Sequence, residues 1–141
     1  MNLEEEILIN KYGQGLLNST ELLSNFNTLD LKKKRLFLSD MTFLIMQSKP
    51  NYDDIETIIS ESKLKPTYTP CILLKKGIEY HNLNKIIELP ENELDKVFLL
   101  FLSAFKIPYQ RKFNEEKEDS NKWWYWDLSD EKKVTEIRKK H

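Results

Sequence analysis

The sequence predicts an all-α protein: a single compact multi-helix bundle in which a tryptophan-rich segment anchors the C-terminal helix. Apolar residues recur at helical spacing along almost the whole chain, and no stretch alternates between apolar and polar residues beside a hairpin turn. Only three glycines and five prolines are available to interrupt helices. The length of 141 residues fits one domain, residues 1–141.

The first third of the chain predicts three helices. The first begins near residue 3 and stops at Gly13 and Gly15, which allow the chain to reverse sharply. Asn18 is the expected N-cap of the second helix, with Glu21 three residues later in a capping-box-like arrangement. Asp30 is the expected N-cap of the third helix, over residues 31–48.

The helix over residues 31–48 is polar at its start and apolar later, with apolar residues on nearly all sides. Such a helix is usually central and surrounded by neighbours. We therefore expect it to pack against the other strongly apolar helix, over residues 90–107. The predicted shared core consists of Phe37, Leu38, Met41, Leu44, Ile45, Phe98, Phe101 and Phe105.

Prolines divide the middle of the chain. Pro50 precedes an amphipathic helix that starts near Asn51. Pro66 and Pro70 predict an extended segment over residues 65–69, because proline disfavours the α conformation in the residue before it. A short helix then begins at Pro70 and is expected to end at Gly77. A brief segment over residues 82–89 follows.

The last third begins with the helix from Pro90, which we expect Pro108 to end. Residues 109–122 then form a charged connection. The tryptophan-rich segment, residues 123–126, comes next, and a final helix follows with Ser129 as its N-cap and basic residues in its last turn.

Charge and cysteine content narrow the classes of function. The 22 basic and 23 acidic residues give a net charge of −1, which argues against a general nucleic-acid binder and against a basic membrane-surface protein. A single cysteine, Cys71, allows no intramolecular disulfide and no cysteine-based zinc site. The start of the chain lacks a secretory pattern, and no apolar run is long enough to cross a membrane. We expect a cytoplasmic protein.

Motifs of known chemistry are absent: no GxGxxG, P-loop, HExxH or GxSxG occurs. Cys71 and His81 could form a thiol–imidazole pair, but a buried cysteine and a surface histidine are the favoured interpretation. Acidic residues at 53, 54 and 56 suit the first turn of a helix and offer too few ligands for a metal. The basic run at residues 32–35 is interpreted as a solvated helix face. We expect no enzymatic activity, no metal and no cofactor.

The stretch "WWYWD" differs from these motifs, because both a structural and a binding role are open for it. It can be a lid whose rings cover the helical core, or a recognition surface, because Trp, Tyr and Arg dominate interface hot spots. The two interpretations are compatible if some rings are buried and another faces outward. The candidate partner-binding residues are Trp123, Trp124, Tyr125, Trp126 and Asp127, extended by Tyr109 and Arg111.

Four stretches carry a resemblance to a known family: "EEILINKYGQGLL", "LKPTYTPCILLKKG", "LLFLSAFKI" and "WWYWDLSD". In order and spacing they resemble a family of small bacterial proteins of unknown function, over nearly the whole chain. The resemblance implies a bacterial, cytoplasmic, stand-alone protein. It implies no activity, because no catalytic residue or cofactor is assigned to that family.

Three functions from different classes follow from these observations. The first is a non-catalytic protein-binding module, such as an immunity or antitoxin-like protein that neutralises a toxin or effector. The second is an enzyme that uses the carboxylates of Asp53, Asp54 and Glu56. The third is a nucleic-acid-associated regulator that uses the basic run at residues 32–35. We rank them in that order, and a protein is the expected partner.

Overall fold

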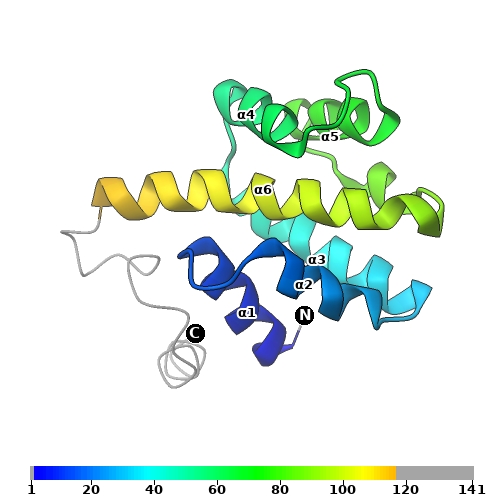
Figure 1. The fold of residues 1–141 in the computed structure, drawn as a ribbon. Helices are drawn as coiled ribbons and strands as arrows, with labels where there is room; N and C mark the ends of the chain where they lie inside the picture. Colours follow the sequence, from blue (N-terminus) through cyan, green and yellow to red (C-terminus); the bar gives the residue numbers. More distant parts are fainter. Residues whose placement is uncertain (1, 117–141) are drawn as a thin grey trace.

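The computed structural model describes residues 2–116, and within them every regular element is helical. The fold class predicted from the sequence is confirmed: the helices pack compactly around one of their number, α6 (Figure 1). The expected anchoring of the C-terminal helix by residues 123–126 lies outside the described residues. The elements are α1 (Leu3–Gly13), α2 (Ser19–Asn27), α3 (Leu31–Ser48), α4 (Tyr52–Ser62), α5 (Thr69–Glu79), the 3-10 helix η1 (Asn84–Glu88) and α6 (Glu91–Glu116).

Polar side chains begin three of these helices where the sequence predicts. Asn18 accepts a hydrogen bond from the Glu21 amide at 3.0 Å, and Asp30 accepts one from the Lys33 amide at 2.8 Å. At α4, Asn51 and Asp54 form a reciprocal capping box, each side chain accepting from the backbone of the other. Each cap satisfies amides that have no partner inside the helix.

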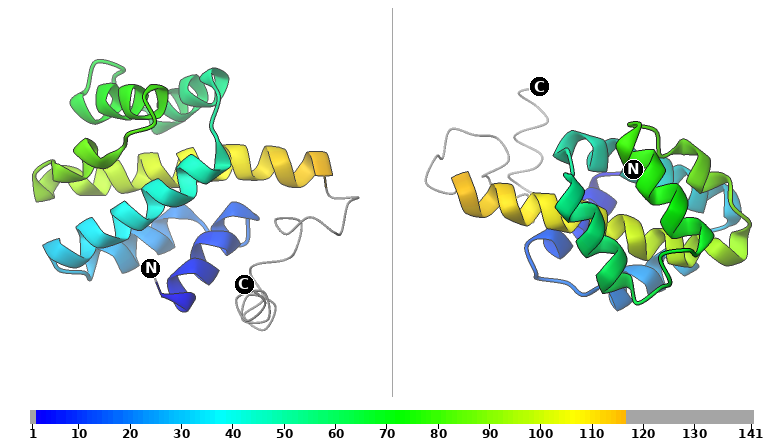
Figure 2. Two further views of the ribbon diagram at one scale, coloured as in Figure 1. Left: turned by 180° about the vertical axis from the view of Figure 1, so that it is seen from behind. Right: turned by 90° about the horizontal axis from the view of Figure 1, so that it is seen from above.

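Helix α6 runs through the middle of the bundle, with α4 and α5 on one side and α1, α2 and α3 on the other (Figures 1 and 2). The prediction that the helix over residues 31–48 is the central one is therefore wrong. Leu36 and Phe43 of α3 are 57% and 66% exposed, so one side of α3 faces solvent. Helix α6 is central because it alone among the described helices touches the five others.

The apolar core between α3 and α6 largely follows the prediction. Six of the eight expected residues are buried, while Phe37 and Leu44 are half-buried and pack against the core. Phe26 stacks on Phe98 with ring centres 4.3 Å apart, and the Phe37 ring meets both edge-on. Phe26 of α2 thus joins a cluster that the sequence assigned to two helices.

Two predicted helix ends are wrong. Helix α6 continues through Pro108 to Glu116, and α5 continues through Gly77 to Glu79. The expected extended segment at residues 65–69 is instead a turn, in which the Tyr68 amide donates to the Lys65 carbonyl at 2.9 Å. In each case contacts with other elements or a local backbone hydrogen bond outweigh the local preference of a proline or glycine.

The described helices also bear on membrane association. None of them combines the length and the apolar content that crossing a bilayer requires.

Candidate functional site

Tyr109 and Arg111, predicted as partner-binding residues, lie in α6 and contact other helices of the bundle. The centres of the Tyr109 and Phe105 rings lie 5.2 Å apart, and Gln14 donates to the Tyr109 hydroxyl at 3.3 Å. The Arg111 Nη1 donates to both carboxylate oxygens of Asp54, at 2.5 and 2.7 Å. Both side chains thereby tie the C-terminal half of α6 to its neighbours.

The other predicted partner-binding residues fall outside the described residues. These are Trp123, Trp124, Tyr125, Trp126 and Asp127.

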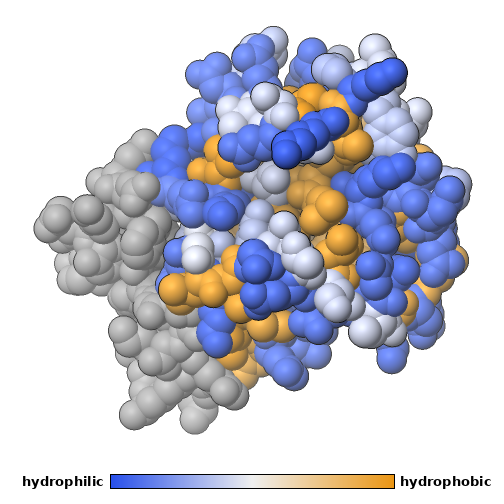
Figure 3. All heavy atoms as spheres, viewed as in Figure 1, coloured by the Kyte–Doolittle hydropathy of each residue, from blue (hydrophilic) through white to orange (hydrophobic). Residues whose placement is uncertain are grey.

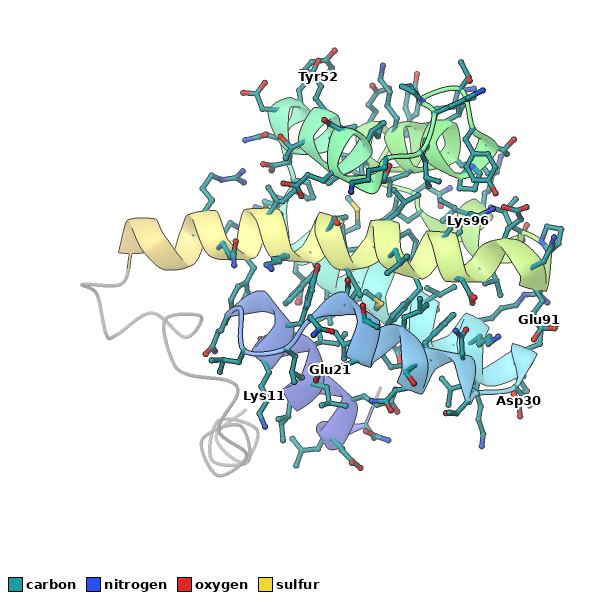
Figure 4. All side chains as sticks on the ribbon, in the orientation of Figure 1. Lys11, Glu21, Asp30, Tyr52, Glu91 and Lys96 are labelled. Atoms are coloured by element: carbon teal, nitrogen blue, oxygen red, sulfur yellow. The ribbon has the colours of Figure 1, made fainter. Side chains whose placement is uncertain are left out.

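The carboxylates considered for catalysis lie in different environments. Asp54 is 5% exposed and is committed to the α4 capping box and to Arg111. Asp53 and Glu56 are exposed, and the Glu56 carboxylate accepts from the Tyr52 hydroxyl, which raises the pKa of that phenol. Tyr52 points away from the bundle at the outer side of α4 (Figure 4). Asp54 thus has a structural role. Its position in the sequence predicts an acidic residue in the first turn of the helix but not the ion pair with Arg111.

The basic run at residues 32–35 is only half solvated, which corrects the sequence interpretation. Lys34 is 8% exposed; its Nζ lies 3.5 Å from a Glu91 oxygen and 5.6 Å from the centre of the Phe26 ring. Arg35 donates to the Leu89 carbonyl at 3.3 Å. Both cations join the start of α3 to the start of α6, near which Asp30 and Glu91 lie together at one end of the molecule (Figure 4). Lys32 and Lys33 remain exposed.

Cys71 and His81 are a buried thiol and an exposed imidazole, as the sequence predicts. Burial raises the pKa of the Cys71 thiol, and a hydrogen bond with Ser62 opposes that effect. A neutral, inaccessible thiol is a poor nucleophile. Among the described residues, no group of three or more His, Cys, Asp or Glu residues is placed to hold a metal ion.

An exposed apolar face on α3 is the feature that the sequence interpretation missed. Leu36 and Phe43 are seven residues apart, so they lie on the same side of the helix about 10 Å apart along its axis. Exposed Lys32 and Gln47 share that side, and we call these four residues the α3 outer face. The sequence carries a signal for this face, namely apolar residues on all sides of the helix, but the same pattern also predicts central burial.

A second feature is an open depression of about 460 Å³ where the α1–α2 turn meets α6. It is lined by Tyr12, Gly15, Leu16, Leu17, Asn18, Ser19, Glu21 and Lys106. Leu16 is 62% exposed at this site, and the Lys106 ammonium lies 4.7 Å from the centre of the Tyr12 ring. Burial, and the nearby Glu61 carboxylate, raise the pKa of the Tyr12 phenol, while a hydrogen bond with Ser103 lowers it.

Apolar side chains also reach the surface among charged ones on the face seen in Figure 3. Exposed large apolar residues outside α3 are Leu16, Tyr52, Ile72, Tyr80 and Leu99. They are spread over the α1–α2 turn, α4, α5 with the residue that follows it, and α6, and two of them are tyrosines whose hydroxyls suit an aqueous surface. Among the side chains that the structure describes, only those of α3 include two strongly exposed, wholly apolar ones on one helix face.

One family model matches this sequence over most of its length. The sequence model of a family described as a family of unknown function (DUF5958) matches residues 4–127. The chain belongs to the DUF5958 family. The DUF5958 match extends eleven residues beyond α6 and includes Trp123, Trp124, Tyr125, Trp126 and Asp127. No match was found among curated proteins or among solved structures.

Proposed function

We propose that this chain is a non-catalytic protein-binding module that contacts its partner through the α3 outer face. The observation that carries the proposal is the exposure of Leu36 and Phe43, 57% and 66%, at the centre of a helix face. Polar residues are usual at such positions, and apolar groups that share one face mark interaction sites. A phenyl ring two helical turns from a leucine on the same face offers the kind of apolar anchor that fills a pocket in a partner.

The partner that we favour is a toxin or effector protein that this chain neutralises, in the manner of immunity and antitoxin proteins. Small helical modules bind such targets by covering a surface, which needs no catalytic group; this is an analogy of class. The single cysteine is unpaired and buried, which fits the reducing cytoplasm, the compartment we propose.

The two alternative functions gain no support from the described side chains that they would use. A carboxylate enzyme would need Asp54, which is held by Arg111 and by the α4 cap. A nucleic-acid regulator would need the basic run, of which Lys34 and Arg35 are engaged within the bundle. Lys32 and Lys33 alone would give a small phosphate footprint.

The proposal is tested by affinity capture from the host with three baits: the full-length chain, Phe43→Asp and Tyr80→Asp. Tyr80 is 76% exposed and directly follows α5, away from α3, so its variant controls for adding a surface charge. A partner identified by mass spectrometry with the unmodified chain and with Tyr80→Asp, but lost with Phe43→Asp, supports the proposal. Titration of that partner should show a loss of affinity of about 30-fold or more for Phe43→Asp.

Equal capture by all three baits would show that the partner binds elsewhere. Capture of nucleic acid that weakens steeply with salt would favour the regulator instead.

A further inference from the structure

The depression between the α1–α2 turn and α6 is a surface with apolar and polar parts, and it is separate from the α3 outer face. Leu16 and Leu17 supply apolar contacts, Glu21 supplies a carboxylate and Lys106 an ammonium. Its volume of about 460 Å³ is within the range of sites that hold a drug-sized organic group. Leu16 is 62% exposed there, so its apolar side chain is accessible to a group that enters the depression.

The depression lies near the C-terminal half of α6. Gln110 donates to the Gly13 carbonyl at 3.1 Å, which fixes the end of α1 against α6. Lys106, in the wall of the depression, is ten residues before Glu116, the last residue of α6. At 1.5 Å per residue this places the depression about 15 Å back along the helix from its end.

The chain that follows α6 is long enough to return to this place. Trp123 is seven residues after Glu116, and seven residues of extended chain span at most about 25 Å. That reach exceeds the roughly 15 Å along the axis and leaves length for the turn. The DUF5958 match to residues 4–127 covers the bundle and the tryptophan-rich segment together.

We propose that the tryptophan-rich segment, residues 123–126, occupies the depression between the α1–α2 turn and α6 of its own chain. Indole rings have the matching chemistry: a large apolar area to lay on Leu16 and Leu17, and an N–H that can donate to the Glu21 carboxylate. An indole face beside Lys106 gains a cation–π contact like the one that Tyr12 makes. This inference is independent of the α3 outer face and of the proposed function.

The test uses the fact that the chain has three tryptophans, all within residues 123–126. Their fluorescence therefore reports on this segment alone. In the folded full-length chain we expect emission at shorter wavelength, and weaker quenching by acrylamide, than in the urea-unfolded chain. Leu16→Asp should move both readings toward those of the unfolded chain, because a carboxylate replaces the apolar contact.

Leu36→Asp is the matched control, since Leu36 is 57% exposed against 62% for Leu16 and lies on α3. It should leave both readings unchanged. Circular dichroism of each variant checks that the helices remain, which the high exposure of both positions favours.

Three results would overturn the proposal. Emission of the unmodified folded chain at the wavelength of the unfolded chain would show that the rings are not covered. Identical emission in the unmodified chain and Leu16→Asp, with folded helices, would place the rings elsewhere. Emission that shifts on dilution would show that a second copy, rather than the same chain, provides the cover.

Discussion

Asp54 shows how one side chain can serve two elements at once. It closes the capping box at the start of α4, and both of its oxygens accept from Arg111 of α6. The sequence correctly places an acidic residue in the first turn of a helix, where the dipole favours it. It cannot show the partner 57 residues away, because that pairing depends on how α4 and α6 pack.

Replacing Asp54 with alanine should destabilise the fold by about 2–4 kcal/mol, since the Asn51 amide loses its acceptor in the capping box and a partly buried guanidinium loses its partner. Asp53→Ala is the matched control, because Asp53 is the exposed carboxylate next to it and its loss should cost less than about 1 kcal/mol. Urea denaturation measures both free energies of unfolding. Equal costs would mean that the ion pair with Arg111 contributes nothing.

Cys71 should resist thiol reagents while the chain is folded. It is fully buried, and burial raises the pKa of its thiol, so little thiolate forms at neutral pH. A bulky maleimide should label it only when urea unfolds the protein, as mass spectrometry can follow. Rapid labelling of the native chain would instead show that α5 opens readily.

At the scale of elements, the sequence predicts helix starts better than helix ends. Starts carry a local chemical marker, as at Asn18 and Asp30. The end predicted at Pro108 is absent because contacts beyond it, such as Gln110 with Gly13 and Arg111 with Asp54, hold another two turns of α6 in place. Such contacts outweigh the cost of a proline inside a helix, and no local pattern reports them.

Gly77 lies inside α5 because the chain packs too closely there for a side chain. A Cβ at this position would lie 2.6 Å from the Asn82 carbonyl oxygen and 3.2 Å from the Leu83 Cα, both of which belong to the backbone. Gly77→Ala should therefore lower the free energy of unfolding by about 1–3 kcal/mol, although alanine is the better helix former. A thermal melt with unchanged or raised Tm would contradict this close approach.

Helix α3 illustrates why burial cannot be read from apolar periodicity alone. Its apolar residues surround the helix, but only the side that faces α6 and its neighbours is covered. The sequence predicts the covered residues, such as Leu38 and Ile45, because they recur at helical spacing. The sequence cannot distinguish these covered residues from Leu36 and Phe43. Residue type alone does not show whether an apolar side chain packs in the core or is available to a partner.

Two phenylalanine truncations separate these cases. Phe101 is fully buried, so Phe101→Ala should cost roughly 3–5 kcal/mol of stability. Phe43→Ala removes the same atoms from a ring that is 66% exposed and should cost less than about 1 kcal/mol. Urea denaturation of both variants gives the comparison. A large loss of unfolding free energy in Phe43→Ala would mean that the ring is covered within the folded chain and is not available to a partner.

At the scale of the whole molecule, α6 joins two groups of helices that would otherwise share little contact. Helices α4 and α5 pack on one side of it, and α1, α2 and α3 on the other (Figure 2). Its buried face includes Leu94, Val97, Phe98, Phe101 and Phe105, and Leu100, Leu102 and Ala104 on either flank of that face are buried as well. The sequence predicts a strongly apolar helix here, but which helix is central depends on what covers each side.

Deleting the residues after Ser120 tests how this bundle depends on the rest of its chain. The bundle over residues 2–116 has its own apolar core, so the truncated protein should keep its helical circular dichroism. If the tryptophan-rich segment covers Leu16 and its neighbours, the deletion should cost about 2 kcal/mol and lower Tm by roughly 5–10 °C. Combining it with Leu16→Asp should add little, because both changes remove the same contact. Additive losses would mean that residues 121–141 stabilise the bundle through another surface, and an unchanged Tm would mean that they do not stabilise it at all.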